Sequence, residues 1–500
     1  MFLRKLKNAS DTVSFQIMEK VGRTNKVVKH LGTAKTLAEQ RDLESLASEY
    51  LKKVRLDKGV VSLFDSRFEI REIEQVLSRF EFLAVHNSNL YHFLLHFHNL
   101  LGFGSLGDSV FRDLMLARIM SPLSKVKTRD YLENSLGIKY SLSSVYRCLK
   151  LAYKNNYQTK LEELVLSFVK QYVSPTISVL FFDVTTLYFE AHDEDDFRKC
   201  GFSKDHKNNQ PQVVVSLTVT HEGFPLNWQI FSGETYEGHT LLPCIRESIK
   251  RTGAKKLVVV ADAGMLNKKN LDSLQADKLH YIVGARLHQL SDKLKEKIIK
   301  IPKRDKTGRR FELSDTQTLL VTYSTKRAAK NKADRKKQVE KAKKALAKGK
   351  EVSGRLKYLS KSEPTTWVLN KDLIAENKKY DGLKGYITNY PKLSNREILK
   401  RYGDLWRVEN AFRMSKSDLM ARPIFHTLEE SIKAHLTLVF GALAISRYIE
   451  YLTHKSIKKI VEILGQAQEV IIRDTITHQT ITKPVHPTYA AKLLLGLIRK

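Results

Sequence analysis

The sequence is poor in cysteine, in long apolar runs and in acidic residues, and each shortage excludes a class of protein. Its 3 cysteines and 16 histidines among 500 residues show no disulfide framework and no zinc-ligand spacing. The most apolar run, Leu436 to Ile445, is too short to span a bilayer and predicts a core helix. The first residues, Met1 to Lys5, lack the apolar region of a secretory signal. We therefore expect a reduced, cytoplasmic protein that does not bind a membrane.

Basic residues are what the sequence has in excess. Lysine and arginine number 86 against 54 aspartate and glutamate residues, which gives a formal net charge of +32 at pH 7. A charge of this size indicates a polyanionic partner, and nucleic acid is the first candidate. A chain of 500 residues is also too long for one hydrophobic core, so several domains are expected.

Two aspartates lie in segments that are predicted to be strands. Residues 179–190 are rich in β-branched and aromatic side chains, which predicts a buried strand with Asp183 in its middle. A shorter apolar run over 256–261 leads directly to Asp262. That acid therefore follows the C-terminal end of a strand, where α/β sheets usually place their chemistry.

The order of the predicted elements indicates how these two acids could meet. The pattern predicts strands over 212–220 and 225–231, helices over 240–251 and 267–277, and a strand over 280–286. A three-strand meander followed by a helical crossover can place the later strand parallel to the first and beside it, because such crossovers are right-handed and short. Asp183 and Asp262 are then expected on neighbouring strands at one edge.

Two neighbouring carboxylates indicate a cation between them, because the acids otherwise repel each other and raise each other's pKa. Hard oxygen ligands of this kind suit Mg²⁺ or Mn²⁺. The structural alternative for each acid alone is that Asp183 is a hydrogen-bonded core acid and Asp262 a helix N-cap.

The N-terminal part is predicted to begin with a small hairpin over 13–31 and an amphipathic helix over 36–53. A further strand-like piece is expected near 59–63. From residue 73 to residue 173 the pattern is almost wholly helical.

Two helices inside this region, over 129–135 and 145–153, have the length of a helix-turn-helix. The second helix carries Arg147 and Lys150, which could face phosphates or bases. The alternative interpretation is an ordinary helical hairpin in a bundle.

A lysine-rich run over 326–350 lacks aromatic residues and predicts an exposed helix. Strand-like segments over 317–324 and 365–369 flank it, so we expect a partly β insertion that carries a basic arm. We interpret the arm as contacting the phosphate backbone, with a solvated surface as the alternative. The lysines expected to contact DNA there are Lys336, Lys337, Lys343 and Lys344.

A third acid lies in a helical pattern over 401–416. Glu409, Arg413 and Lys416 stand at i, i+4 and i+7, so one helix face is expected to carry a carboxylate beside two cations. The functional interpretation is a third metal ligand beside donors for a phosphate. The alternative is a salt-bridged surface face.

With these three acids the sequence resembles the DDE transposases of bacterial insertion sequences, in the branch with a tyrosine, arginine, glutamate, lysine signature. Tyr402, Glu409 and Lys416 fall at the spacings of that signature, whereas its arginine position is Leu405. Nearby arginines that could substitute are Arg401, Arg407 and Arg413. The stretches that also carry the resemblance are 182–186, 201–205, 233–240, 260–264, 284–286 and 422–426.

The resemblance implies an α/β fold with an RNase H-like catalytic core, interrupted by a partly β, lysine-rich insertion and preceded by a mainly helical N-terminal DNA-binding region. The boundaries expected are 1–72 for the N-terminal hairpin and helix, 73–175 for the helical region, 176–286 and 379–455 for the two parts of the core, 287–378 for the insertion, and 456–500 for a helical tail.

The resemblance further implies that Asp183, Asp262 and Glu409 hold two Mg²⁺ or Mn²⁺ ions and catalyse strand cleavage and strand transfer at transposon ends. A homodimer assembled on double-stranded DNA in the bacterial cytoplasm is expected. Further DNA contacts are expected from Tyr402, Arg413, Lys416 and Arg286. The rival hypotheses are a metal-dependent nuclease that does not join strands and an inactive, transposase-derived DNA-binding protein.

Overall fold

The structure is a computed structural model of the chain, and it describes residues 1–9, 11–22, 24–57, 78–190, 193–207, 209–254, 257–265, 267–305, 307–347, 356–361 and 366–498. Two compact units make up the chain. The first comprises residues 1–83 and 471–482, and the second comprises residues 84–470 and 483–500. The strand-like piece expected near 59–63 lies outside the described residues.

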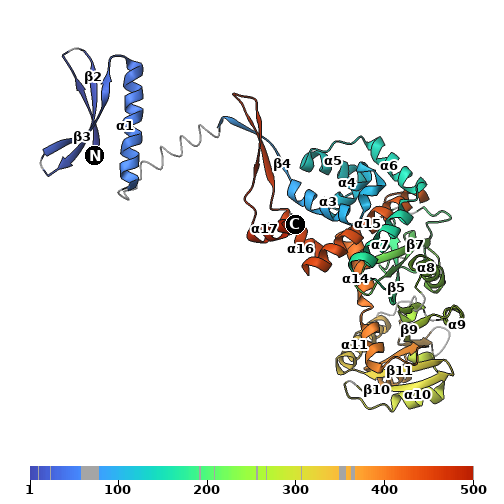
Figure 1. Ribbon diagram of the computed structural model, residues 1–500. Helices are drawn as coiled ribbons and strands as arrows, with labels where there is room; N and C mark the ends of the chain where they lie inside the picture. Colours follow the sequence, from blue (N-terminus) through green and yellow to red (C-terminus); the bar gives the residue numbers. More distant parts are fainter. Residues whose placement is uncertain are drawn as a thin grey trace. The chain divides into compact units, whose positions relative to one another are not determined.

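In the first unit an antiparallel sheet of order β1-β2-β3 packs against one helix (Figure 1). The elements are β1 (Phe2–Lys7), β2 (Val13–Val21), β3 (Thr24–Ala34) and α1 (Leu37–Asp57). The hairpin predicted over 13–31 and the helix predicted over 36–53 are confirmed by β2, β3 and α1. The first strand, β1, was not predicted from its pattern.

The helical prediction for 73–173 is wrong at its start, where β4 (Phe80–His86) is a strand. This strand joins β15 (Glu469–Asp474) and β16 (Thr480–Pro484) in a sheet of order β16-β15-β4, so the tail after residue 456 is not purely helical either. The physical reason is long-range pairing: Arg79 Nε donates to Asp474 Oδ1 at 2.9 Å across 395 residues of chain. A short apolar segment suits a helix or a strand until its partner is known.

The second unit is built on an eight-stranded sheet of order β10-β11-β14-β9-β8-β5-β6-β7. Its first strands form an antiparallel meander, and β8 lies parallel to β5 and beside it, as the sequence predicted. Helix α8 makes the crossover, and α9 leads on to β9. These elements are β5 (Val179–Tyr188), β6 (Gln212–Val219), β7 (Pro225–Ser232), α8 (Glu237–Thr252), β8 (Val258–Ala261), α9 (Lys268–Ala276) and β9 (His280–Ala285).

The two faces of this sheet pack into two hydrophobic cores, because successive strand residues point to opposite faces. On β5, Phe181 and Leu187 belong to one core, whereas Phe182 and Val184 belong to the other. The second core also takes apolar residues from α8, α9 and α10 (Asp292–Ile299). The chain is therefore a mixed α/β protein with helices on both faces of its main sheet.

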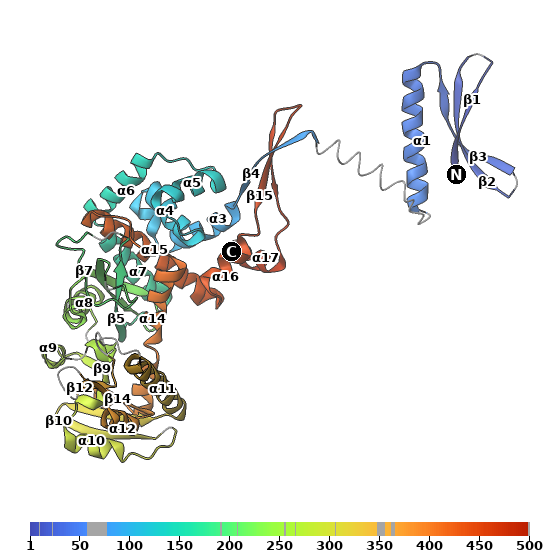
Figure 2. The ribbon, with the colours of Figure 1, turned by 180° about the vertical axis from the view of Figure 1, so that it is seen from behind.

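Helices from two distant parts of the sequence cover the first face. A long helix, α15 (Glu429–Thr453), contacts α3 (Ser88–Leu100), α4 (Ser109–Met120), α6 (Leu142–Lys154) and α7 (Tyr157–Tyr172), and α5 (Lys125–Leu136) packs against α4 and α6. Figures 1 and 2 show these helices gathered around α15. Of the described residues, α15 alone is long and apolar enough to cross a membrane, but 89% of its apolar window is buried inside the protein. It is a core helix, as predicted for residues 436–445.

Strands that flank the lysine-rich run belong to the main sheet. Strands β10 (Gly308–Ser314) and β11 (Gln317–Tyr323) form a hairpin, and β14 (Leu383–Thr388) joins β11 to β9. The predicted exposed helix is confirmed as α11 (Thr325–Ala347), while residues 348–350 lie outside the described part. The small elements that follow are β12 (Leu359–Lys361), β13 (Trp367–Leu369) and α12 (Lys371–Lys379).

The helical pattern over 401–416 is divided between three elements. Helix α13 (Asn395–Gly403) begins at Ser394, which forms a capping box with Glu397. Helix α14 (Trp406–Arg413) follows and continues into a π-helix over Met414–Asp418. Because a π-helix has more residues per turn, the i, i+7 relation expected between Glu409 and Lys416 is not kept. The last helices are α16 (Ile457–Leu464) and α17 (Tyr489–Gly496).

Candidate active site

Asp183 and Asp262 come together through strand pairing. Asp183 lies in the middle of β5, and Asp262 directly follows β8. The two strands are parallel and place Phe182 opposite Ala261. One residue farther along each strand, the two aspartates stand opposite each other, as the sequence predicted.

Both aspartate side chains leave the same face of the sheet. Asp183 follows Phe181 by two residues and Asp262 follows Val260 by two residues, so each aspartate points to the same face as its apolar neighbour. Phe181 and Val260 belong to the first core, on the face that α14 and α15 cover. The two carboxylates therefore point toward the helix that carries the third acid.

Glu409 lies on α14, which packs against β5. Its negative charge is close enough to Asp183 to contribute to the raised pKa of that carboxyl. Within the described residues no ion pair joins Glu409 to Arg413, whose Nη2 instead donates to Asn410 Oδ1 at 2.6 Å. The structure thus brings Glu409 toward the two aspartates.

Tyr402 holds the second aspartate from the side of α13. Its hydroxyl donates to Asp262 Oδ1 at 2.9 Å, and its ring is 6% exposed. Room for the hydroxyl comes from Gly284 on β9, where a Cβ would lie 2.7 Å from Tyr402 Oη. Tyr402 was expected to contact DNA. In the structure its hydroxyl contacts Asp262 inside the site, and little of the residue is exposed to a ligand.

A fourth acid and a lysine complete the surroundings of Asp183. Lys204 Nζ lies 3.8 Å from Asp183 Oδ1 and 3.1 Å from Glu237 Oε1, and it also donates to the carbonyl oxygen of Val184. Burial raises the pKa of Asp183 to about 6; the charge of Lys204 opposes this shift, and the charges of Glu237 and Glu409 add to it. We call Asp183, Asp262, Glu409 and Glu237 the carboxylate site.

A second lysine, Lys384 of β14, lies on the other side of Tyr402, with its Nζ 4.2 Å from the centre of that ring. Burial lowers the pKa of Lys384, and the charges of Asp262 and Glu409 oppose that shift. The acids of the carboxylate site therefore outnumber the lysines beside them.

The donor chemistry of the carboxylate site fits a hard divalent cation. Carboxylate oxygens are the ligands that Mg²⁺ and Mn²⁺ prefer. Burial is the largest cause of the raised pKa of Asp183, and a positive charge beside this carboxylate would oppose that shift, as the charge of Lys204 does. Among the described residues, however, no three His, Cys, Asp or Glu side chains are grouped closely enough to hold a metal ion. The described side-chain positions bring the acids near one another without forming a closed ligand set.

The other residues of the signature make internal contacts. Lys416 Nζ binds Asp205 Oδ2 at 2.9 Å, and Arg422 Nε reaches the same oxygen at 3.1 Å. Leu405, at the arginine position, is 4% exposed and belongs to the first core. Of the nearby arginines, Arg407 Nε lies 3.7 Å from Asp404 Oδ1.

The remaining basic residues expected to bind DNA lie mostly at the surface. On α11, Arg335 pairs with Asp381 and Ala342 is buried, so this stripe of the helix faces the protein. The lysines one and two positions later are exposed, namely Lys336, Lys337, Lys343 and Lys344. Arg147 and Lys150 are exposed on α6, and Arg286 is half-buried after β9.

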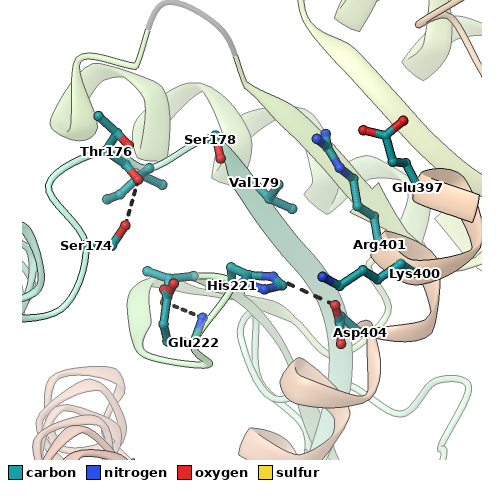
Figure 3. A pocket seen from close by; sticks show the side chains of 12 residues that line it. Ser174, Thr176, Ser178, Val179, His221, Glu222, Glu397, Lys400, Arg401 and Asp404 are labelled. Atoms are coloured by element: carbon teal, nitrogen blue, oxygen red, sulfur yellow. Dashed lines mark hydrogen bonds and ion pairs between the residues drawn. The ribbon is translucent and has the colours of Figure 1, made fainter. Parts of the chain in front are cut away.

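A separate cavity of about 290 Å³ lies at the start of β5 (Figure 3). It is lined by Val179 of the strand, by Ser178 before it, and by Lys400, Arg401 and Asp404. Asp183 follows Val179 by four residues, which on a strand is about 13 Å. In Figure 3 His221 reaches across this cavity toward Asp404, at 3.8 Å between Nδ1 and Oδ2. The cavity is therefore distinct from the carboxylate site.

Sequence reasoning missed Lys204, Glu237, Lys384 and the space that Gly284 provides. Three of these residues, Lys204, Glu237 and Gly284, lie in stretches that carried the family resemblance, 201–205, 233–240 and 284–286, but they were assigned no role. Their signal was motif membership alone, because Lys204 and Glu237 lie on no strand beside the aspartates and a glycine in a strand does not show which side chain uses its space.

Comparison with known proteins gives a family match. A family model described as the transposase DDE domain matches residues 174–445, which is more than half of the 500-residue chain. No curated protein matches the chain. One similar solved structure is the cryo-EM structure of the piggyBac transposase synaptic complex with hairpin DNA. It has 12% sequence identity and a TM-score of 0.39, and the match covers 74% of this chain and 70% of that chain. At that TM-score the likeness carries no argument, so the assignment depends on the family match: this chain belongs to the family of DDE transposases.

Proposed function

We propose that the protein binds the ends of an insertion sequence and catalyses metal-dependent DNA strand cleavage followed by strand transfer. Membership of the DDE transposase family supports this proposal. The observation that carries it is the meeting of Asp183 and Asp262 on adjacent parallel strands, with Glu409 near enough to affect the pKa of Asp183. The strand order β7-β6-β5-β8-β9 also supports an RNase H-like core.

In the proposed reaction, Asp183, Asp262 and Glu409 hold two Mg²⁺ or Mn²⁺ ions. When bound, such ions activate the attacking oxygen and stabilise the leaving oxygen of a phosphodiester. The protein's own contribution is to hold the ligands in place. Tyr402 orients Asp262, and the sheet fixes the spacing of the two aspartates. Water is the attacking group in cleavage, and a DNA 3′-hydroxyl is the attacking group in strand transfer.

The proposed DNA contacts follow the exposed cations. The lysines of α11 and the exposed Arg147 and Lys150 of α6 are free to meet phosphates, and the net charge of +32 favours binding along the backbone. Such contacts set position and affinity and do not read bases. We further propose a homodimer assembled on double-stranded DNA in the bacterial cytoplasm.

The test is cleavage and joining of labelled DNA that carries the element's ends, with and without Mg²⁺. We expect the wild-type protein to nick the ends and to join them to a second duplex only with the metal. Glu409→Gln should abolish both reactions and leave DNA binding intact. The matched control is Glu429→Gln, which removes an exposed glutamate that pairs with Lys433 within α15.

The outcomes of this experiment separate the rival functions. Cleavage without joining would replace the proposal with a nuclease, and binding without either reaction would replace it with an inactive DNA-binding protein. Full cleavage by Glu409→Gln would show that Glu409 is not a metal ligand.

A further inference from the structure

A second cavity, of about 680 Å³, lies away from the carboxylates on the helical side of the second unit. It is bounded by the end of α4, the first turn of α5, one residue of α6, the segment 420–426 and His435 of α15. Its charged and ionisable lining residues are Arg118, Lys125, Lys127, Arg422, His426 and His435. We call this the basic cavity, because no acidic residue is among those that line it in the described structure.

Two of its cations are buried without a counter-charge. Arg118 is 6% exposed and Lys125 is 5% exposed. Within the described residues no carboxylate pairs with either of them. Buried lysine and arginine are ordinarily paired, because removing their charge from water is costly. An unpaired Arg118 at the wall of a cavity therefore indicates a ligand of opposite charge.

The surrounding groups hold these cations in place without neutralising them. Lys125 Nζ donates to His435 Nδ1 at 3.2 Å, and His435 Nε2 lies 3.2 Å from the carbonyl oxygen of Ala421. The second contact requires a proton on Nε2, which leaves Nδ1 to accept from the lysine. Burial, helped by the charges of Lys125 and Arg118, lowers the pKa of His426 to about 4. Burial also lowers the pKa of His435, so the two imidazoles are neutral. Burial and the charge of Arg118 lower the pKa of Lys125 as well, so a bound anion would favour the charged form of this lysine.

The first turn of α5 adds partial positive charge to the basic cavity. Lys125 is the first residue of α5, and Lys125, Val126 and Lys127 all line the cavity. The N-terminal end of a 12-residue helix carries partial positive charge and favours anions. This helix end by itself would not define a site, but, like the buried and unpaired Arg118, it favours an anion in the cavity.

The basic cavity is linked by ion pairs to the lysine of the signature, and its rim adjoins the exposed face of α6. Arg422 lines the cavity and binds Asp205, which also binds Lys416 of the signature. On the other side the rim is formed by Tyr146 and Phe425, which are 45% and 65% exposed. Tyr146 precedes the exposed Arg147 on α6, so a strand that follows α6 would pass the opening of the cavity.

From this arrangement we propose that the basic cavity binds a phosphate group, with Arg118 and Lys125 as its charged donors, and that the phosphate belongs to a DNA strand. The second part of this inference rests on the function proposed above. The volume lies within the range of sites that hold a whole small ligand, so the sugar attached to the phosphate has room against the aromatic rim. Bidentate donation from a guanidinium suits phosphate oxygens.

The phosphate site is tested by thermal unfolding of the full chain in sodium phosphate and in sodium chloride at equal ionic strength. A ligand that binds only the folded protein raises its Tm. We expect phosphate to raise the Tm of the wild type and of the control Lys139→Gln equally, since Lys139 is an exposed lysine of the same helical region. Arg118→Gln and Lys125→Met should lose this increment.

Lys125→Met keeps the test decisive if Arg118→Gln fails to fold. Replacing a buried unpaired cation by an apolar side chain of similar length removes a desolvation cost, so its Tm in chloride should equal or exceed that of the wild type. An equal phosphate increment in the wild type and in Lys125→Met would overturn the site, and so would the absence of any phosphate increment beyond that of chloride.

The source of the phosphate is tested by DNA binding measured as fluorescence anisotropy with a labelled oligonucleotide. We expect Lys125→Met to weaken binding, and added inorganic phosphate to weaken it in the wild type more than in Lys125→Met. If phosphate binds but DNA affinity is the same in both proteins, the assignment to DNA is overturned. Comparing DNA binding with DNA cleavage separates this inference from the proposed function. If the wild type binds DNA through Lys125 but never cleaves it, the cavity assignment stands and the proposed reaction fails.

Discussion

The carboxylate site and the basic cavity each hold an excess of one charge, which is negative in the first and positive in the second. Each gathers charges of one sign around a half-buried or buried member, Asp183 in the first and Arg118 in the second, and each has too few partners of the other sign. In the carboxylate site Lys204 lies between Asp183 and Glu237, and Tyr402 donates to Asp262. In the basic cavity no acid among the described residues faces Arg118. In both regions hydrophobic residues in place of the buried charges would cost less free energy of folding. The charges therefore indicate ligand binding rather than a contribution to stability.

The two regions differ in the rigidity of their supports. The two aspartates stand on neighbouring strands in the middle of an eight-stranded sheet. The basic cavity is assembled from helix ends and from the segment 420–426. Metal ligands need fixed spacing, whereas a phosphate can be held by long, flexible side chains. We therefore expect small changes at the carboxylates to lower cleavage strongly, and changes at the basic residues to lower DNA affinity by graded amounts.

The largest effect is expected from removing one aspartate. Asp183→Asn or Asp262→Asn should lower Mg²⁺-dependent cleavage by about a thousandfold or more, because losing a ligand removes several kcal/mol of metal-derived stabilisation. Folding and DNA binding should stay near wild type, since the amide keeps the shape of the carboxylate. Cleavage of end-containing DNA and circular dichroism check this. Cleavage within tenfold of wild type by either variant would contradict the site.

The raised pKa of Asp183 predicts a pH-dependent cost in the metal-free protein. The folded pKa is about 6, against an ordinary value near 3.9. The folded state therefore binds this proton more tightly, and stability is lost as pH rises from about 4 through 6. Asp183→Asn lacks this loss, so its advantage in the free energy of unfolding should grow by up to about 3 kcal/mol over that range.

Urea unfolding at pH 4, 5, 6 and 7 in a chelator measures this difference. The control is Asp196→Asn, which changes an exposed aspartate of a loop. Adding Mg²⁺ at pH 7 should stabilise the wild type and not Asp183→Asn. A constant difference across the pH range would show that folding does not raise the pKa of Asp183.

The contact between Tyr402 and Asp262 predicts an intermediate effect. Tyr402→Phe removes the hydrogen bond, and Gly284→Ala places a methyl group 2.7 Å from the tyrosine hydroxyl. Changes to groups that orient metal ligands typically cost about 10–100-fold in metal affinity or activity. Titrating cleavage against Mg²⁺ should show a higher metal requirement in both variants. Gly403→Ala is the matched control, because a Cβ there meets open space.

The sequence was sufficient for the parts of the fold that depend on local pattern and short connections. The meander, the crossover and the pairing of Asp183 with Asp262 followed from strand composition and from the handedness of crossovers. Strand β4 was missed because its partner, β15, lies almost the whole chain away. The extension of the main sheet by β10 and β11 was missed for the same reason, since strand order across a sheet has no local signal.

For the candidate site, spacing identified the three acids but not their supporting residues. The position of Lys204 depends on the path of a loop, and the role of Gly284 depends on a tyrosine 118 residues farther along the chain. The face expected for Glu409, Arg413 and Lys416 assumed one regular helix, and the π-helix at Met414–Asp418 turns Lys416 toward Asp205 instead. Side-chain direction changes with each departure from regular geometry.

The smallest effects are expected on the basic arm, where each lysine acts alone and in water. Replacing Lys336, Lys337, Lys343 or Lys344 singly by Gln should lower the slope of log affinity against log salt by up to about 0.9, or about fivefold in affinity at 0.15 M salt, equally for all DNA sequences. Lys455→Gln, an exposed lysine before α16, is the control. Anisotropy titrations at several salt concentrations, on two unrelated duplexes, measure both quantities. A loss confined to one duplex with an unchanged slope would mean that the arm reads bases. An unchanged affinity on both duplexes would mean that α11 is a solvated surface. The graded effects on DNA affinity would then be expected only at the basic cavity and at α6.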